Sequence, residues 1–156
     1  MSIIQVDTLQ KRDGSTFPLG KIGQVLSTTI GSEQSTTSSS FSDITGLSQA
    51  ITPTSTSSKI LVQSEIMMDL RHGAGNTTFG TIRLLKDSTT LETMNSFGQN
   101  NIGNGNPDKF VFNGYHTFLD SPSSTSALTY KYQFFCTDGT LRIGVNSKIT
   151  LLEVLA

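Results

Sequence analysis

The sequence predicts an all-β protein, a jelly-roll-like antiparallel β-sandwich of about 8–10 strands. Segments in which polar and apolar residues alternate recur at short spacing, and each ends at a turn rich in Gly, Pro, Asn, Asp or Ser. No segment has the period of an amphipathic helix. Ser and Thr make up roughly a quarter of the chain, and they favour strands and turns over helix interiors.

The longest strand candidate lies within residues 47–70 and follows a shorter strand and a polar turn around Pro53. We expect it to be the centre of a sheet, because strands on both sides of it in the sequence can pair with it. At about 12 residues it is long for a globular protein. One face is apolar except for Ser64; the other is polar except for Leu61 and Met67. The apolar face consists of Ile60, Val62, Ile66, Met68 and Leu70, and the polar face carries Gln63, Glu65 and Asp69.

Residues 1–20 are predicted to be an extended N-terminal attachment arm, and residues 21–156 the sandwich domain. The arm offers apolar side chains on both faces of a short segment, and a connector too rich in turns to be core follows it. The alternative is an ordinary first strand that pairs within its own subunit. The apolar side chains of the arm are Ile3, Ile4, Val6 and Leu9.

Residues 21–30 are expected to be a strand with Ile22, Leu26 and Ile30 on one face. The low-complexity segment 31–40 is expected to be a solvated polar loop.

Further strand candidates fill the second half of the chain. The clearest alternation predicts one inward face made of Leu128, Tyr130, Tyr132, Phe134 and Cys136. The last candidate has apolar groups on both faces, which is typical of a strand covered on both sides. The candidates are residues 78–86, 89–94, 110–119, 127–136, 141–145 and 147–156.

Composition disfavours several classes of protein. A net charge of -1, from 11 basic and 12 acidic residues, leaves no phosphate-binding footprint, so we expect no nucleic acid partner. The single cysteine, Cys136, allows no intrachain disulfide, and its place on an apolar strand face predicts an inert buried thiol. The N-terminus lacks the pattern of a secretory signal, and no apolar run approaches roughly 18 residues, so we expect no membrane insertion.

No residue pattern predicts catalytic chemistry, a metal site or a cofactor. The two histidines, His72 and His116, are far apart in the sequence, and no spacing of His, Cys or carboxylates fits a metal site. A nucleophile needs a base to activate it, and no such pair is apparent. We therefore expect a protein that is not an enzyme.

Two loops are the candidate sites of host recognition. The first follows the long strand and carries Arg71, His72 and Asn76; the second is the Asn- and Gly-rich segment 95–109. Amides bond sugar hydroxyls and aromatic rings stack on sugar faces, so such loops on a rigid scaffold suit a host surface glycan. The alternative is that Asn and Gly serve only the turn conformations. The candidate residues of the second loop are Phe97, Asn100, Asn101, Asn104 and Asn106.

Six segments, taken in order, resemble a family of short virion proteins of tailed phages of cyanobacteria and other marine bacteria, described as tail fibres or tail-fibre-like. The match spans nearly the whole chain but not the two candidate loops. The resemblance implies a non-enzymatic component of the particle and supplies no catalytic or binding residues. The segments are VDTLQKRDG (6–14), LGKIGQVLS (19–27), FSDITGLSQAITPTSTSSKILV (41–62), IRLLKDSTT (82–90), FLDSPSSTSALTYKYQF (118–134) and SKITLLEVLA (147–156).

The expected protein is therefore a homotrimer in a phage virion, assembled in the host cytoplasm together with other virion proteins. The trimer follows from the resemblance and from the two-sided apolar strand at residues 147–156. The expected role is host adsorption, as a tail fibre or knob, or virion decoration, including a head fibre. A lectin-like carbohydrate-binding module without a particle is the alternative of a different class. A glycan depolymerase comes third. Such an enzyme would need a pair of carboxylates in a groove, and no such pair is apparent in the sequence.

Overall fold

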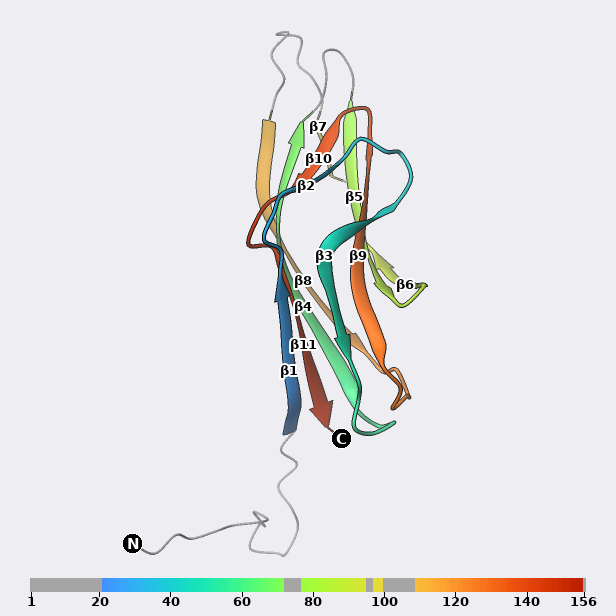
Figure 1. Cartoon of the computed structure of the whole chain (residues 1–156). Coiled ribbons are helices and arrows are strands. Elements are labelled where there is room, and N and C mark those ends of the chain that lie inside the picture. The colour runs from blue at the N-terminus through green and yellow to red at the C-terminus, as the bar shows by residue number, and fades with distance from the viewer. Residues whose placement is uncertain (1–20, 72–76, 95–96, 100–108, 156) are drawn as a thin grey trace, which may run out of the picture.

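The computed structural model describes residues 21–71, 77–94, 97–99 and 109–155, and this part of the chain forms a sandwich of two antiparallel sheets (Figure 1). The strands are β1 (Lys21–Thr29), β2 (Gln34–Thr36), β3 (Ser42–Ile51), β4 (Lys59–Arg71), β5 (Thr78–Lys86), β6 (Thr89–Thr93), β7 (Phe97–Gln99), β8 (Lys109–Asp120), β9 (Leu128–Thr137), β10 (Thr140–Ile143) and β11 (Lys148–Leu155).

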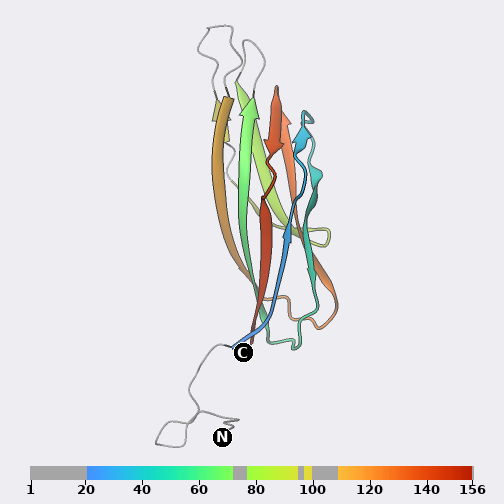
Figure 2. The ribbon, with the colours of Figure 1, turned by 60° about the vertical axis from the view of Figure 1, so that its left-hand side comes forward.

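The strand order is that of a jelly roll. The first sheet runs β1-β11-β4-β8, as Figure 2 shows. Beyond the end of β11, β10 pairs with the same edge of β4, and β2 pairs with the other edge of β10. The second sheet runs β3-β9-β5, with β6 and β7 following each other along the far edge of β5. The chain crosses between the sheets after β2, β3, β4, β7, β8 and β9, so successive long strands lie in opposite sheets. The predicted all-β, jelly-roll-like antiparallel sandwich is confirmed.

The long strand predicted to be the centre of a sheet is β4. One of its edges pairs with β8 from Ile60 to Arg71. Its other edge pairs first with β11, as far as Glu65, and then with β10 from Met68 onward. The predicted inward face is confirmed, because Ile60, Val62, Ile66, Met68 and Leu70 are all buried.

The core lies between the sheets, where β9 faces β4. The predicted inward face of β9 is confirmed: Tyr130, Tyr132, Phe134 and Cys136 are buried, and Leu128 packs against them. Burial, with a smaller contribution from the charge of Asp138, raises the pKa of Cys136 to about 11, so its thiol stays protonated.

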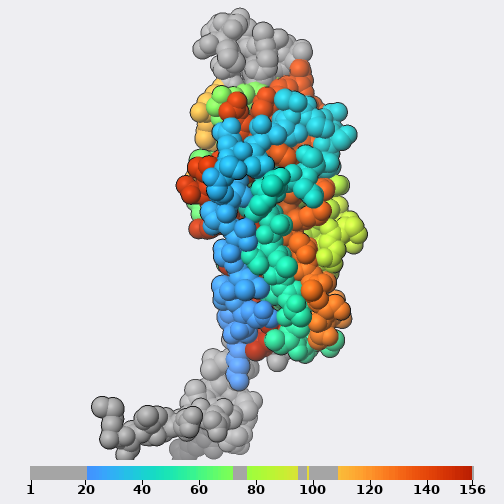
Figure 3. All heavy atoms as spheres, in the orientation of Figure 1, coloured from blue at the N-terminus to red at the C-terminus, as the bar shows by residue number. Residues whose placement is uncertain are grey.

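One side of the sandwich is closed by the edge strands β1 and β3, which lie side by side on the face shown in Figure 3. The side-chain amide of Gln24 donates a hydrogen bond to the carbonyl oxygen of Thr52 at 2.7 Å, and the hydroxyl of Thr28 donates to the side chain of Gln49. These polar contacts join the two sheets where no backbone ladder connects them.

Three local predictions were wrong. A β-bulge in β1 between Ile22 and Val25 turns Ile22 outward, so it does not share a face with Leu26. The segment 31–40, predicted to be a loop, contains β2, which pairs with β10. Phe97, predicted to lie in a loop, belongs to β7, which pairs with β5.

The last strand, β11, carries an unexpected buried carboxylate. Leu151 and Glu153 both point between the sheets, and both are fully buried. Glu153 accepts hydrogen bonds from the backbone N–H of Thr54 at 2.6 Å, the Thr54 hydroxyl at 2.8 Å and the Gln24 amide at 2.8 Å. Burial alone would raise the pKa of Glu153, but the hydrogen bonds outweigh burial and lower it to about 2. Glu153 thus ties the turn between β3 and β4 to β11 and β1.

Replacing Phe134 by alanine should lower the free energy of unfolding by roughly 3–5 kcal/mol, because the lost ring leaves a cavity between the sheets. Chemical denaturation measures this change. The matched control is Phe79→Ala on the neighbouring strand, where the side chain is 44% exposed and the cost should stay below roughly 1 kcal/mol. An equally small loss for Phe134→Ala would contradict the burial of that ring.

The stability that Glu153 contributes should depend on pH. The pKa of Glu153 is about 2 in the folded protein and 4.5 ordinarily. Its contribution to stability is therefore complete above pH 4.5 and is lost as the pH falls through the folded-state pKa of about 2. The Glu153→Gln variant should be less stable than the parent protein at pH 7, and this difference should shrink between about pH 4.5 and 2. Urea denaturation of both proteins across this pH range measures the difference in their free energies of unfolding. The other carboxylates titrate in both proteins, so their contributions cancel in this difference. A constant difference would show that the charge of Glu153 contributes nothing.

Candidate functional site

The two predicted recognition loops leave the sandwich from the same end. Arg71, the first residue of the first loop, and Lys109, the last residue of the second, are paired neighbours in β4 and β8. Thr78, which follows the first loop, is the pairing partner of Gln99, which belongs to the segment predicted as the second loop and ends β7. The other predicted contact residues in the loops and the arm lie outside the described residues; they are His72, Asn76, Asn100, Asn101, Asn104 and Asn106, and Ile3, Ile4, Val6 and Leu9.

At this end of the molecule, cations gather around one carboxylate. A nitrogen of Arg71 lies 2.7 Å from an oxygen of Asp69, and the ammonium of Lys109 lies 3.7 Å from the same oxygen. Burial opposes ionisation of Asp69, but the hydrogen bond from Arg71 and the charges of Arg71, Lys109 and Arg142 hold its pKa below the usual value. Arg142 also pairs with Glu33 at 2.8 Å. Of the predicted contact residues, Arg71 is therefore placed at the loop end with its guanidinium engaged by Asp69.

The chain enters the sandwich at the opposite end. Lys21, where β1 begins, pairs with Leu155, where β11 ends. Figure 1 shows this end of the sandwich far from the end at which the two loops leave. The long axis of the molecule therefore separates the point where residues 1–20 join from the point where the loops leave.

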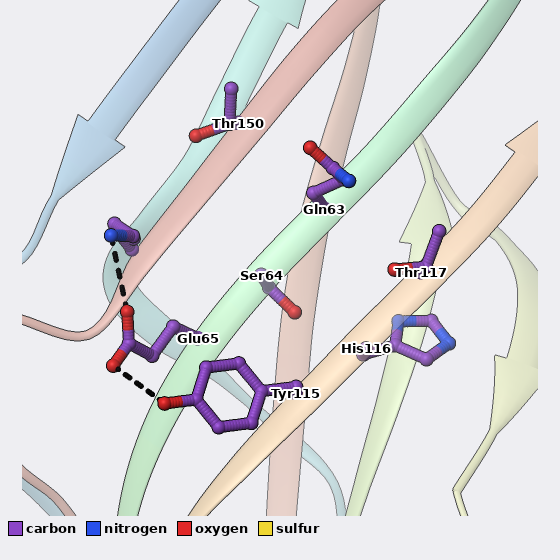
Figure 4. A pocket seen from close by; sticks show the side chains of 8 residues that line it. Gln63, Ser64, Glu65, Tyr115, His116, Thr117 and Thr150 are labelled. Carbon is purple, nitrogen blue, oxygen red and sulfur yellow. Dashed lines mark hydrogen bonds and ion pairs between the residues drawn. The ribbon is translucent and has the colours of Figure 1, made fainter.

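A hollow of about 410 Å³ lies on the outer face of the first sheet, over β8, β4 and β11 (Figure 4). Two cross-strand rows of outward side chains form it. In one row Tyr115, Glu65 and Lys148 are neighbours across three strands, and in the other Thr117, Gln63 and Thr150 are neighbours. The hollow thus combines an aromatic ring, a carboxylate, an ammonium, an amide and two hydroxyls.

Tyr115, with 74% of its surface accessible, is more exposed than any other large hydrophobic residue in the described part of the chain. Its hydroxyl donates a hydrogen bond to Glu65 at 3.2 Å, and the ammonium of Lys148 lies 3.1 Å from the other oxygen of Glu65. Lys148, and to a smaller degree Tyr115, lower the pKa of Glu65. The ring is held at its hydroxyl end while most of its surface stays open to solvent.

Two residues beneath the hollow belong to a polar network that runs from the core to the surface. The Ser64 hydroxyl and the Nδ1 atom of His116 each lie 2.8 Å from the hydroxyl of Tyr132, and Nε2 of His116 lies 3.1 Å from a carboxylate oxygen of Glu92. The residue types are those of a catalytic relay, but Ser64 is only 6% exposed and contacts Tyr132 rather than the histidine. The network therefore joins the two sheets, because Ser64 and His116 belong to one and Tyr132 and Glu92 to the other.

Within the described ranges, no three His, Cys, Asp or Glu side chains lie close enough together to hold a metal ion. The same part of the chain contains no helix of the length and apolarity that crossing a membrane requires.

No family model matches the chain, and no curated protein matches it. Solved structures of infectious bursal disease virus are similar to it. The Gt strain structure matches with 16% identity and a TM-score of 0.43, over 96% of this chain and 36% of the viral chain. The VP2 subviral particle matches with 14% identity and a TM-score of 0.35, over 97% and 41%. The Gx strain structure matches with 13% identity and a TM-score of 0.35, over 97% and 42%. This chain spans less than half the length of each.

Proposed function

We propose that this protein is a non-enzymatic component of a phage virion, a tail-fibre-like or knob-like homotrimer that serves host adsorption or decorates the particle. The observation that carries the proposal is the polarity of the sandwich. The segment 1–20 joins at one end, and the two candidate recognition loops leave from the other. A protein fixed to a particle through one end presents its other end to the surroundings.

The six segments of the family resemblance support this division of roles. They include residues 6–14 of the proposed arm and most of the sandwich strands, but neither candidate loop. An attachment element has to fit a partner within the particle, whereas a recognition loop has to fit whatever the host displays. The same polarity serves a tail fibre, a head fibre or a capsid decoration protein.

Deleting residues 2–18 tests the attachment role. The sandwich should stay folded, with only a small change in melting temperature, because the described strands pair among themselves. Incorporation into phage particles should fail, which an immunoblot of purified particles measures. Unfolding of the shortened protein would show that the segment is a core strand. Normal folding together with normal incorporation would place attachment on another surface.

A second candidate function, lectin-like glycan binding, is favoured by the hollow around Tyr115. An exposed ring next to amide, hydroxyl and charged groups suits a sugar, whose apolar face stacks on the ring while its hydroxyls bond the polar groups. Gln63, Thr117 and Thr150 offer such groups beside the ion pair of Glu65 and Lys148. This surface would bind glycan alongside the loops or in their place.

Tyr115→Ala should abolish glycan binding through the hollow while leaving the fold intact, because the side chain is 74% exposed. Binding is measured on a glycan array and then by calorimetry with the glycan that scores highest. The matched control is Val111→Ala, a change on the same strand and the same face at a side chain that is 49% exposed. Unchanged binding by Tyr115→Ala would exclude the hollow as the glycan site.

A further inference from the structure

An apolar row crosses the outer face of the first sheet near the end at which β1 begins. The register aligns Val25 of β1, Leu152 of β11, Leu61 of β4 and Leu119 of β8 as direct neighbours across four strands. Val25 and Leu119, at the two ends of the row, are 58% and 52% exposed, and the two leucines between them are half-buried. Figure 2 shows the four strands side by side.

The β-bulge in β1 enlarges this row into a patch. It turns Ile22, which is 50% exposed, toward the same face, where Ile22 pairs with Val154. The next outward position on each strand, moving toward the hollow, is polar. That polar row consists of Ser27, Thr150, Gln63 and Thr117.

A solvent-facing side of an antiparallel sheet normally carries polar residues, and a contiguous apolar patch on it marks an interaction site. The apolar patch ends at the polar row. It is therefore a bounded surface of the size of a specific contact, and the sheet face as a whole is not apolar.

We propose that residues 3–9 of a neighbouring copy of this chain cover the apolar row. The inference rests on the proposed homotrimer and names the contact through which the copies hold one another. Residues 3–9 offer four apolar side chains in seven positions. Their single charge is that of Asp7, and Lys59 lies exposed at the border of the patch, paired with Val154. Apolar surface and charge of the two partners are thus complementary.

The distances allow this contact. Four strands span about 14 Å from the first to the fourth, at roughly 4.8 Å per step. An extended segment of the length of residues 3–9 reaches about 23 Å, and the connector 10–20 reaches up to about 36 Å, at roughly 3.3 Å per residue. The arm leaves at Lys21, one residue before the patch begins at Ile22.

Exchange between copies is compatible with a closed, symmetric oligomer. Each copy carries one arm and one row, so arms passed from each copy to the next close a ring in which every row is covered. An arm folded back on its own row would cover the same side chains but would hold no copies together.

Disulfide trapping in the full chain tests the contact. One copy carries Ile4→Cys and a size tag, the other carries Leu119→Cys, and the two are co-expressed and oxidised. We expect a disulfide-linked heterodimer. The native Cys136 is buried and should not compete. The matched control is Val111→Cys, at a side chain 49% exposed on the same face of β8, about 26 Å along the strand from Leu119; it should give no heterodimer. Equal trapping at positions 111 and 119 would overturn the proposal.

Two further measurements complete the test. By light scattering, the combined change Val25→Ser and Leu119→Ser should convert trimer to monomer, whereas Ser27→Ala with Thr117→Ala in the polar row should leave the trimer intact. A trimer that survives the apolar-row change overturns the proposal. With both cysteines on one chain, a disulfide that forms only within single copies would also overturn the proposal, because it would show that the arm folds back on its own copy. A protein that cross-links as expected but is absent from particles keeps this inference and loses the proposed function; one that enters particles without cross-linking does the reverse.

Discussion

The two-sided pairing of β4 is the constraint on which the rest of the structure depends. β8 binds one of its edges from end to end, and β11 and β10 divide the other. Since its inward side chains are buried all along its 13 residues, a slip by one residue would exchange the core face for the solvent face. The register of the whole first sheet is therefore fixed, and with it the position of every outward side chain.

The outward residues of β4 connect the three surfaces of functional interest. Leu61 lies in the apolar row, Gln63 and Glu65 lie in the hollow, and Asp69 gathers the cations at the loop end. Leu61, the hollow and Asp69 thus follow one another along a single strand, from the end where residues 1–20 join to the end where the loops leave, with the apolar and 36% exposed Met67 between the hollow and Asp69. Under the proposed function, the apolar row lies toward the particle and Asp69 lies toward the host.

The sequence predicts best where a strand has one dry face and one wet face. The alternation in β4 and β9 identified the buried side chains of both strands, because a period of two survives without knowledge of the partners. It failed in β1, where the bulge before Val25 reverses the faces without any signal in the residue types. It also failed for β2, whose residues Gln34–Thr36 read as a polar loop and become a strand only through β10.

The candidate site was less predictable because its parts meet only through pairing. The ring of Tyr115 and its neighbours Glu65 and Lys148 come from three strands, and nothing in their spacing announces that they touch. In the sequence, Glu153 looks like a solvent-facing residue among apolar ones. In the structure it is buried and accepts hydrogen bonds from Thr54 and Gln24, which come from two other segments. The chain that links Ser64, Tyr132, His116 and Glu92 likewise draws on four strands.

The apolar row consists of residues that, in the sequence alone, look like random interruptions of the polar–apolar alternation. On β4, Leu61 is an apolar exception on a polar face, and a single exposed leucine or valine on a protein surface needs no explanation. The exceptions at Val25, Leu61, Leu119 and Leu152 differ because the register brings them into one line, although they come from four strands with four different loops between them. A shift of one residue in any of the three pairings would scatter them over both faces. Exceptions to alternation that coincide across neighbouring strands therefore indicate an interface, whereas isolated ones do not.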